Sequence, residues 1–300
     1  MSYLIKTGGT SIVLGEGHFS TFVPIKKNKL VKITKINTFN NEFRIADKVR
    51  SINNYAEHFI IPDAEVKTIK PSDEFYKHVE KLVKDYNMGI FGYDLLYFYV
   101  DNAGDLDMID SIEELKIKYD FSIWKSYKFI MKFAVKIMEA INYLHQNKIC
   151  HLDIKPENIM INRSTKQFKL IDFGFAFEEP FTEFIQKPRG TPGYFPQYFV
   201  NDTVTPYLPK INANDRIRIN CKFPIELNMK LVYKIDSYCL GRTLHHLKYI
   251  YKDNRYYECF NTEKKMERRV DKLIEDLMYD NVFHRKTIKE CLIKYYSGNL

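Results

Sequence analysis

The sequence predicts an α+β fold, with a strand-rich part at the N-terminus and a larger, mainly helical part after it. Three runs with the residue content of β-strands, 10–14, 21–25 and 29–35, follow one another closely near the N-terminus. After residue 100, apolar side chains recur at helical spacing. The clearest such stripe is formed by Ile130, Phe133, Ala134, Ile137, Ile141 and Leu144.

The composition is that of a soluble, globular chain. Its 300 residues are 45% hydrophobic and 28% charged, which is enough apolar material for one large domain or two smaller ones. The N-terminal residues lack the apolar core of a signal peptide, and no apolar run approaches the roughly 18 residues of a membrane span. The five cysteines include no Cys-x-x-Cys pair, which favours a reducing compartment. We therefore expect a cytoplasmic protein.

The first two predicted strands are joined by a short turn that holds Gly15 and Gly17. A strand on each side argues against a dinucleotide-binding loop, which a helix would follow. The third strand carries two lysines. Lys32 lies in Leu-Val-Lys-Ile, flanked by apolar residues, whereas Lys35 lies near the end of the strand. Lys32 is therefore the better candidate for a lysine held on a buried strand, and Lys35 is the alternative.

A helix is predicted over 41–52, where the apolar residues at 45, 46, 49 and 52 form one stripe. Glu42 falls on the same face, and an unpaired charge would be costly to bury there. Lys32 is its natural partner. The alternative is that Glu42 only interacts with the positive end of the helix dipole.

The sequence predicts the structure of three further segments. An amphipathic helix is expected over 72–86, with Ser72 as its N-cap. A strand is expected over 93–100. Residues 200–230 have no clear period, which indicates a long irregular insertion.

The densest concentration of polar chemistry lies at 151–158, His-Leu-Asp-Ile-Lys-Pro-Glu-Asn, directly after the helical stripe. This stretch holds a candidate general base in Asp153, a cation in Lys155 and an amide in Asn158. Such a cluster on a short connection indicates an active site.

A second short run, at 168–171, leads into Asp-Phe-Gly at 172–174. Amide and carboxylate oxygens are the ligands that Mg²⁺ takes when substrate phosphates complete its shell, so Asn158 and Asp172 are candidate metal ligands. In this order and at this spacing, the two segments resemble those of the protein kinase family. Residues 151–158 are similar to the kinase catalytic loop H-R-D-L-K-x-x-N, and the D-F-G motif is unaltered.

The resemblance implies a bilobal kinase fold and a division of labour among the catalytic residues. Asp153 would orient the acceptor hydroxyl and take its proton, and Lys155 would lie near the γ-phosphate. Asn158 and Asp172 would hold Mg²⁺, so ATP and Mg²⁺ are the expected cofactors. The N-lobe, hinge and C-lobe would span 1–100, 101–104 and 105–300.

The nucleotide-binding roles also follow from the resemblance. Lys32 would fix the α and β phosphates and Glu42 would hold Lys32, while a hinge after the strand at 93–100 would contact adenine and ribose. Ser20 stands in place of the third glycine of the kinase turn, so closure of this turn over the phosphates should differ. The expected nucleotide-binding residues are Gly15, Gly17, Lys32, Glu42, Tyr99, Asp101 and Asp105.

The segment 190–197, Gly-Thr-Pro-Gly-Tyr-Phe-Pro-Gln, resembles the kinase substrate-binding segment G-T-P-x-Y-x-A-P-E. Gln197 replaces its glutamate, for which Arg285 is the expected partner. Asp236 resembles the aspartate that binds backbone near the catalytic loop, although it could also be a helix N-cap. Together with Lys155, the segment is similar to Ser/Thr-type kinases, so we expect protein substrates with serine or threonine acceptors.

One departure from the family concerns regulation. Leu152 stands where many kinases carry an arginine that receives a phosphate from the activation loop. Between Gly174 and Gly190, Thr182 is the only residue with an aliphatic hydroxyl, and no tyrosine occurs there. The resemblance therefore predicts activity without loop phosphorylation.

Other interpretations remain open. A pseudokinase scaffold would keep the fold alone, although the intact catalytic set argues against it. A small-molecule kinase would share Asp153 and Asn158, but 190–197 favours a protein substrate. A nucleic-acid-binding module is supported only by the net charge of +8, and the lysines are spread along the chain, as on a solvated surface. Lysine, isoleucine and asparagine are abundant, which indicates AT-rich coding, and Lys32 follows Phe22 by only ten residues, which indicates a compressed N-lobe. Both features resemble divergent kinases of large cytoplasmic DNA viruses, which would place the protein in host cytoplasm or virion.

Overall fold

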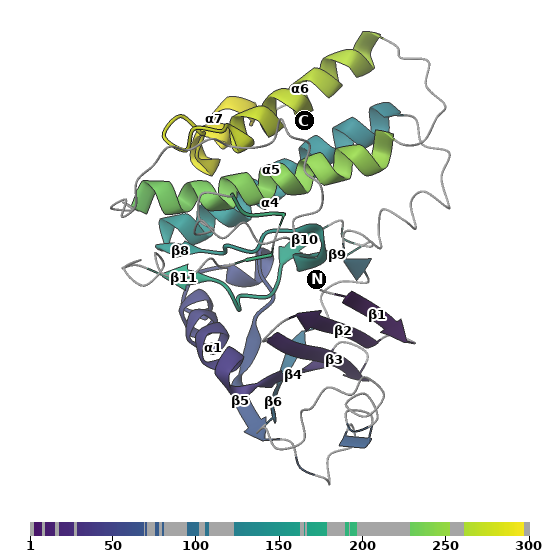
Figure 1. Ribbon diagram of the computed structural model, residues 1–300, viewed down its shortest axis with the longest axis vertical. Coiled ribbons are helices and arrows are strands. Elements are labelled where there is room, and N and C mark those ends of the chain that lie inside the picture. The colour runs from purple at the N-terminus through teal and green to yellow at the C-terminus, as the bar shows by residue number, and fades with distance from the viewer. Residues whose placement is uncertain are drawn as a thin grey trace. The chain divides into compact units, whose positions relative to one another are not determined.

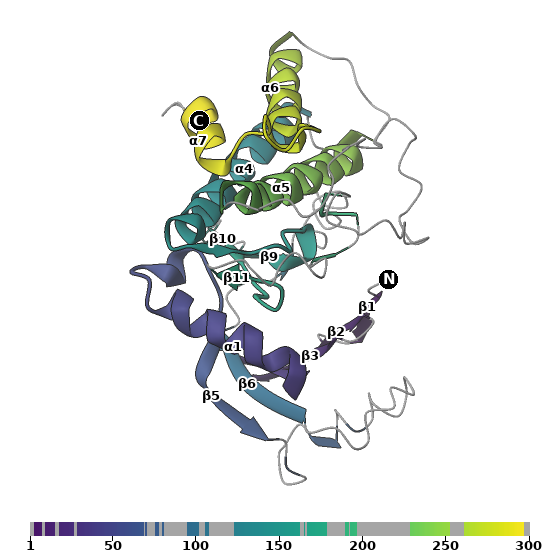
Figure 2. The same ribbon diagram turned by 60° about the vertical axis from the view of Figure 1, so that its left-hand side comes forward.

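The computed structural model describes most of the chain as two compact units (Figures 1 and 2). The described residues are 3–7, 10–15, 18–26, 29–68, 70, 76–77, 80, 95–101, 106–107, 123–162, 165, 167–178, 190–191, 193–196, 229–252 and 261–296. The small unit comprises Met1–Ala56, Ile60–Ala103 and Asp172–Gly174. The large unit comprises Glu57–Phe59, Gly104–Ile171 and Phe175–Leu300. Helices and antiparallel sheets are both present, as the α+β class predicts, whereas the predicted lobe and hinge boundaries stay a prediction.

The small unit is built on one antiparallel sheet of six strands in the order β1-β2-β3-β4-β6-β5. The strands are β1 (Tyr3–Thr7), β2 (Thr10–Gly15), β3 (His18–Lys26), β4 (Lys29–Lys35), β5 (Pro62–Thr68) and β6 (Leu95–Asp101). Strands β2 and β3 form a hairpin in which Gly15 pairs with His18, in agreement with the predicted strand–turn–strand arrangement. Strand β4 has the predicted bounds and lies between β3 and β6, so Lys32 stands on an interior strand.

Helix α1 (Ile36–Arg50) follows β4 directly and packs on the sheet against β4, β5 and β6. Figure 2 shows it lying along β5 and β6. Ile45, Ala46 and Val49 of the predicted stripe are fully buried. Ile52, its fourth member, lies beyond the end of the helix at Arg50 and is only partly buried. The helix begins five residues before the predicted start at 41, because the chain passes from strand into helix without a loop. A short 3₁₀ turn, η1 (Tyr55–Glu57), follows it.

In the described part of the large unit, the helices are α4 (Ile123–Gln146), α5 (Met229–Lys252), α6 (Asn261–Met278) and α7 (Ile288–Tyr295). Figure 1 shows α4 and α5 side by side, and α6 packs against both. All six apolar residues predicted for the stripe on α4 are fully buried. Gly241 permits a close approach of α5 to α6, because a Cβ there would lie 2.4 Å from the side chain of Met278.

Two small sheets of short strands flank the predicted catalytic loop in the large unit. One sheet has the order β10-β9-β7, and the other pairs β11 with β8. Their bounds are β7 (Leu106–Asp107), β8 (Ile149–Cys150), β9 (Ile159–Asn162), β10 (Gln167–Leu170) and β11 (Phe177–Glu178). The predicted catalytic loop runs between β8 and β9, and it includes the 3₁₀ turn η2 (Pro156–Asn158). Proline at the start of this turn suits its fixed φ.

Some predictions fall outside the described part of the chain. Of the predicted helix 72–86, only residues 76, 77 and 80 are described, and of the predicted insertion 200–230, only 229 and 230, which begin α5. Strand β1 was not predicted at all. None of the helices within the described ranges combines the length and apolar character needed to cross a membrane.

Candidate active site

The small unit holds a cluster of three charged side chains. Lys32 Nζ on β4 lies 2.7 Å from Glu42 Oε1 and 2.9 Å from Glu42 Oε2 on α1. It also lies 3.2 Å from Asp172 Oδ1. Lys32 and Glu42 are each only 3% exposed, so each charge needs the other. The predicted pairing of Glu42 with Lys32 is confirmed, and the reading of Glu42 as a helix-dipole residue alone is wrong.

The electrostatics of this cluster favour a charged lysine. Burial lowers the pKa of Lys32, but the carboxylates of Asp172 and Glu42 outweigh it, and the net shift is upward. Burial raises the pKa of Glu42, while Lys32 acts in the opposite direction. With both carboxylates ionised, two negative charges share one ammonium group. The cluster then has a net charge of −1, which suits a site that receives a cation.

The backbone around Asp172 is held in an unusual conformation. Asp172 has φ +65°, in the left-handed region that few non-glycine residues adopt. Its Oδ1 accepts a hydrogen bond of 3.3 Å from the amide of Gly174. The carbonyl of Gly174 in turn accepts a 3.0 Å hydrogen bond from Nδ2 of Asn41, on α1. Sequence reasoning missed Asn41, although a polar residue directly before Glu42 on an inward-facing helix was a usable signal.

The large unit holds the second cluster, at the predicted catalytic loop. Asp153 Oδ2 accepts a 2.8 Å hydrogen bond from Nδ2 of Asn158, and Asp153 Oδ1 accepts one of 2.8 Å from the amide of Thr191. Lys155 Nζ lies 3.3 Å from Asp153 Oδ2 and donates to Thr191 Oγ1 at 2.7 Å. Asp153, Lys155 and Asn158 are all buried. Both carboxylate oxygens are thus fixed in direction, as a positioned base requires.

Asn158 fits the role of an oxygen donor. Its Nδ2 donates both to the side chain and to the backbone carbonyl of Asp153. Because the nitrogen is used in this way, Oδ1 is the amide atom that can bind a cation. Asp172 offers a carboxylate that is 34% exposed. Both groups have the hard oxygen chemistry that Mg²⁺ requires.

Thr191 reaches Asp153 because Gly190 lies directly against the catalytic loop. Gly190 has φ +108°, and a Cβ built on it would lie 2.4 Å from the carbonyl oxygen of Leu152. No side chain fits in that space, so glycine is required for the approach. The sequence motif identified this segment but did not reveal its contact with Asp153.

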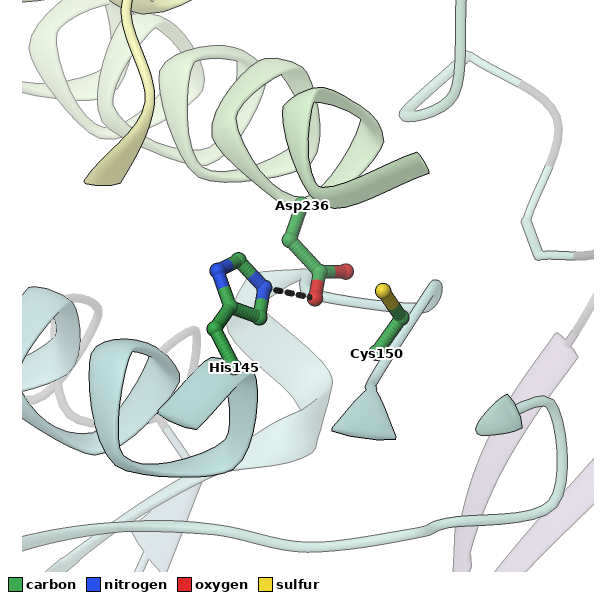
Figure 3. Close-up of side chains that lie close together, drawn as sticks. All are labelled: His145, Cys150 and Asp236. Atoms are coloured by element: carbon green, nitrogen blue, oxygen red, sulfur yellow. Dashed lines mark hydrogen bonds and ion pairs between the residues drawn. The ribbon is translucent and has the colours of Figure 1, made fainter. Parts of the chain in front are cut away.

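A buried aspartate anchors the start of the catalytic loop. Asp236 on α5 accepts hydrogen bonds from the amides of His151 (2.9 Å) and Leu152 (2.7 Å), as predicted. The helix-cap alternative is wrong, because α5 begins at Met229. Figure 3 shows His145 on α4 directed at the same carboxylate, at 2.8 Å, with Cys150 on its other side. Since three donors already hold Asp236, this cluster is explained by anchoring of the loop.

The remaining predicted residues either lie on strands of the small unit or fall outside the described ranges. Gly15 ends β2, while Tyr99 and Asp101 lie on β6, paired with Val31 and Lys29 of β4. Gly17, Asp105 and Gln197 lie outside the described residues.

Arg285, the predicted partner of Gln197, is buried and donates hydrogen bonds to the carbonyls of Tyr279 and Lys234. Its predicted link to Gln197 therefore stays a prediction.

Comparison with known proteins gives a consistent result. The family described as "Protein kinase domain" matches residues 11–297. A protein of Acanthamoeba polyphaga mimivirus named as a serine/threonine-protein kinase is 26% identical over 266 residues, 82% of each chain. Myosin light chain kinase family member 4 of mouse is 46% identical over 70 residues, 23% of this chain and 18% of that protein. The human protein of the same name is 34% identical over 111 residues, 35% of this chain and 29% of that protein. The match thus spans under a third of these two mammalian relatives.

Proposed function

Because the chain belongs to the protein kinase family, we propose that it transfers the γ-phosphate of ATP to serine or threonine hydroxyl groups of protein substrates. The observation that carries this proposal is the arrangement around Asp153. Its carboxylate is buried, and both of its oxygens are fixed, by Asn158 and by the amide of Thr191. The printed name of the mimivirus relative, which specifies a serine/threonine-protein kinase, supports the choice of acceptor.

Phosphoryl transfer requires mainly positioning and charge stabilisation from the protein. In the proposed mechanism, Asp153 accepts a hydrogen bond from the acceptor hydroxyl and takes its proton as the hydroxyl oxygen bonds to the γ-phosphorus. The bond between that phosphorus and the β–γ bridging oxygen breaks at the same time, and ADP leaves. Lys155, 3.3 Å from the same carboxylate, stabilises the negative charge of the transferred phosphoryl group. Its contact with Thr191 holds the lysine toward the segment expected to bind substrate.

We assign the nucleotide and metal to the residues that fit them chemically. Lys32, kept charged by Glu42 and Asp172, suits the α and β phosphates. Asn158 and Asp172 would hold Mg²⁺, which when bound neutralises charge on the phosphates. The residues proposed for the phosphate turn and the hinge are Gly15, Gly17, Tyr99, Asp101 and Asp105.

We further propose that activity does not depend on phosphorylation of the activation loop. Leu152 is fully buried, has φ +65°, and donates its amide to Asp236. An apolar side chain at this position cannot bind a phosphate, so a phosphate on Thr182 would lack this partner. Phosphatase-treated protein and a Thr182→Ala variant should keep most of the wild-type turnover. Loss of most of the turnover in either one would refute this proposal.

A cytoplasmic location is proposed on the basis of thiol chemistry. Cys239 and Cys291 are buried thiols, and burial raises the pKa of both, that of Cys291 to about 12. Because both side chains are thiols rather than halves of disulfides, they suit a reducing compartment.

The test of the main proposal is transfer of labelled phosphate from ATP. Wild type and Asp153→Asn should be compared with generic protein substrates, with small hydroxyl acceptors and with EDTA. We expect transfer to serine and threonine of proteins, loss on chelation, and a fall on the order of 100-fold or more in Asp153→Asn. Nucleotide binding without transfer would instead identify a pseudokinase. Transfer to the small acceptors alone would identify a small-molecule kinase.

A further inference from the structure

Helix α1 makes two separate connections to the Asp-Phe-Gly segment, both within the small unit. The first runs through Glu42 and Lys32 to the carboxylate of Asp172. The second is direct: Asn41, the residue before Glu42, donates its Nδ2 to the carbonyl of Gly174 at 3.0 Å. Asn41 therefore contacts the Gly174 end of the 172–174 segment directly, whereas its neighbour Glu42 reaches the Asp172 end only through Lys32.

The position of Asn41 is costly for the helix itself. Asparagine is a poor helix former, because its amide competes for backbone hydrogen bonds. Asn41 lies inside α1 rather than at a cap, since the helix spans Ile36–Arg50. Its Oδ1 accepts a 3.3 Å contact from exposed Arg44 one turn later, which leaves Nδ2 directed at Gly174. A tertiary role explains the residue better than helix propensity does.

The segment that Asn41 holds needs support. Asp172 has φ +65°, a conformation that costs an aspartate energy and persists only where the surroundings hold it. The amide of Gly174 is bound to Asp172 Oδ1 at 3.3 Å, while the carbonyl of Gly174 is bound by Asn41. Without the Asn41 donor, the carbonyl of Gly174 would lose this hydrogen bond, and the 172–174 turn would be held less firmly. Asp172, the proposed metal ligand, lies at the other end of this turn.

We propose that Asn41 is a positioning residue, which fixes the direction of the Asp172 carboxylate by binding the carbonyl of Gly174. The inference rests on the proposed kinase function. In this inference Asn41 acts on the reaction through the 172–174 backbone, by way of its bond to the carbonyl of Gly174. Its loss should therefore change the response to Mg²⁺ and the turnover more than the KM for a peptide substrate.

The experiment compares Asn41→Ala and Asn41→Asp with Arg44→Ala. The Arg44→Ala variant removes the contact between Arg44 and Oδ1 of Asn41 but keeps Nδ2, the donor to Gly174. In Asn41→Ala we expect kcat to fall about three- to tenfold, the loss of one hydrogen bond, with a higher Mg²⁺ concentration for half-maximal activity. Asn41→Asp should fall further, because a carboxylate would face the Gly174 carbonyl. Arg44→Ala should resemble wild type.

Hydrogen exchange provides a readout that needs no catalysis. Amides in a peptide covering 171–178 should exchange about three- to tenfold faster in Asn41→Ala than in Arg44→Ala, while the melting temperature stays the same or rises because alanine favours helix. Equal exchange and equal kcat in the two alanine variants would overturn the inference. If wild type transfers no phosphate, the proposed function fails, whereas the exchange comparison still decides whether Asn41 holds this segment.

Discussion

Gly190 offers the sharpest test of how the catalytic loop is assembled. An alanine there would place Cβ 2.4 Å from the carbonyl oxygen of Leu152, whereas a Cβ at Gly193 would meet no atom of the described residues within 4 Å. Both glycines have positive φ, +108° and +93°, so alanine at either costs on the order of 1–3 kcal/mol in backbone strain. Gly193→Ala is therefore a matched control, and the difference between the two variants isolates the contact with Leu152.

The magnitude follows from the geometry of the neighbouring bond. To reach an ordinary contact distance, the segment must move by about 1 Å. The amide of Thr191 now lies 2.8 Å from Asp153 Oδ1, and such a shift would take it out of hydrogen-bond range. A hydrogen bond to a charged group contributes about 1.5–3 kcal/mol. We expect kcat/KM for a peptide substrate to fall on the order of 10- to 100-fold further in Gly190→Ala than in Gly193→Ala.

The assay is steady-state phosphate transfer to a peptide, with circular dichroism to show that both variants fold. Equal losses in the two alanine variants would refute the reasoning, since backbone strain alone would then account for the effect. A loss confined to Gly190→Ala, with unchanged secondary structure, would support it.

Three further outcomes are expected. Asp236→Asn should lower the free energy of unfolding in guanidinium by about 3 kcal/mol, because it replaces a buried carboxylate that accepts hydrogen bonds from two backbone amides. A change below about 1 kcal/mol would contradict the anchoring role. Lys32→Met should reduce phosphate transfer on the order of 100-fold or more, since it leaves Glu42 buried without its cation, and Lys35→Met should not; the reverse result would show that the lysine was wrongly assigned. Burial raises the pKa of Glu157, so the stability it contributes is present below the ordinary glutamate pKa of about 4.3 and is lost as pH rises through the raised pKa. In Glu157→Gln, the free energy of unfolding in urea should therefore fall less between pH 4 and pH 7 than in wild type. An equal fall in the two proteins would contradict a raised pKa for Glu157.

The pairing of Lys32 with Glu42 could be predicted because its physical cause is local and general. A lysine between apolar residues on a strand and a glutamate on the apolar face of a helix both face burial, and each needs an opposite charge. The stripe on α4 was predictable for a similar reason, since helical spacing alone decides which side chains face the core.

The contacts that were missed depend on backbone atoms. Thr191 binds Asp153 through its amide, and Asn41 binds a carbonyl, so residue type carries little information about either. Leu152 and Asp172 both have φ +65°, a conformation that neither residue favours. Their conformations are imposed by tertiary hydrogen bonds, such as those from the Leu152 amide to Asp236, and are therefore not encoded in local sequence.

The small unit is not a continuous stretch of chain, and this affects how the molecule can be synthesised and folded. Its charged cluster joins Lys32 to Asp172, 140 positions later. A ribosome therefore completes the strands and α1 long before it supplies the third member of the cluster. During that interval Lys32 and Glu42 can neutralise each other, but the proposed metal ligand is absent. The cluster with its excess negative charge can form only after the catalytic loop has also been made, so a nascent chain should gain affinity for Mg²⁺ and nucleotide late in synthesis.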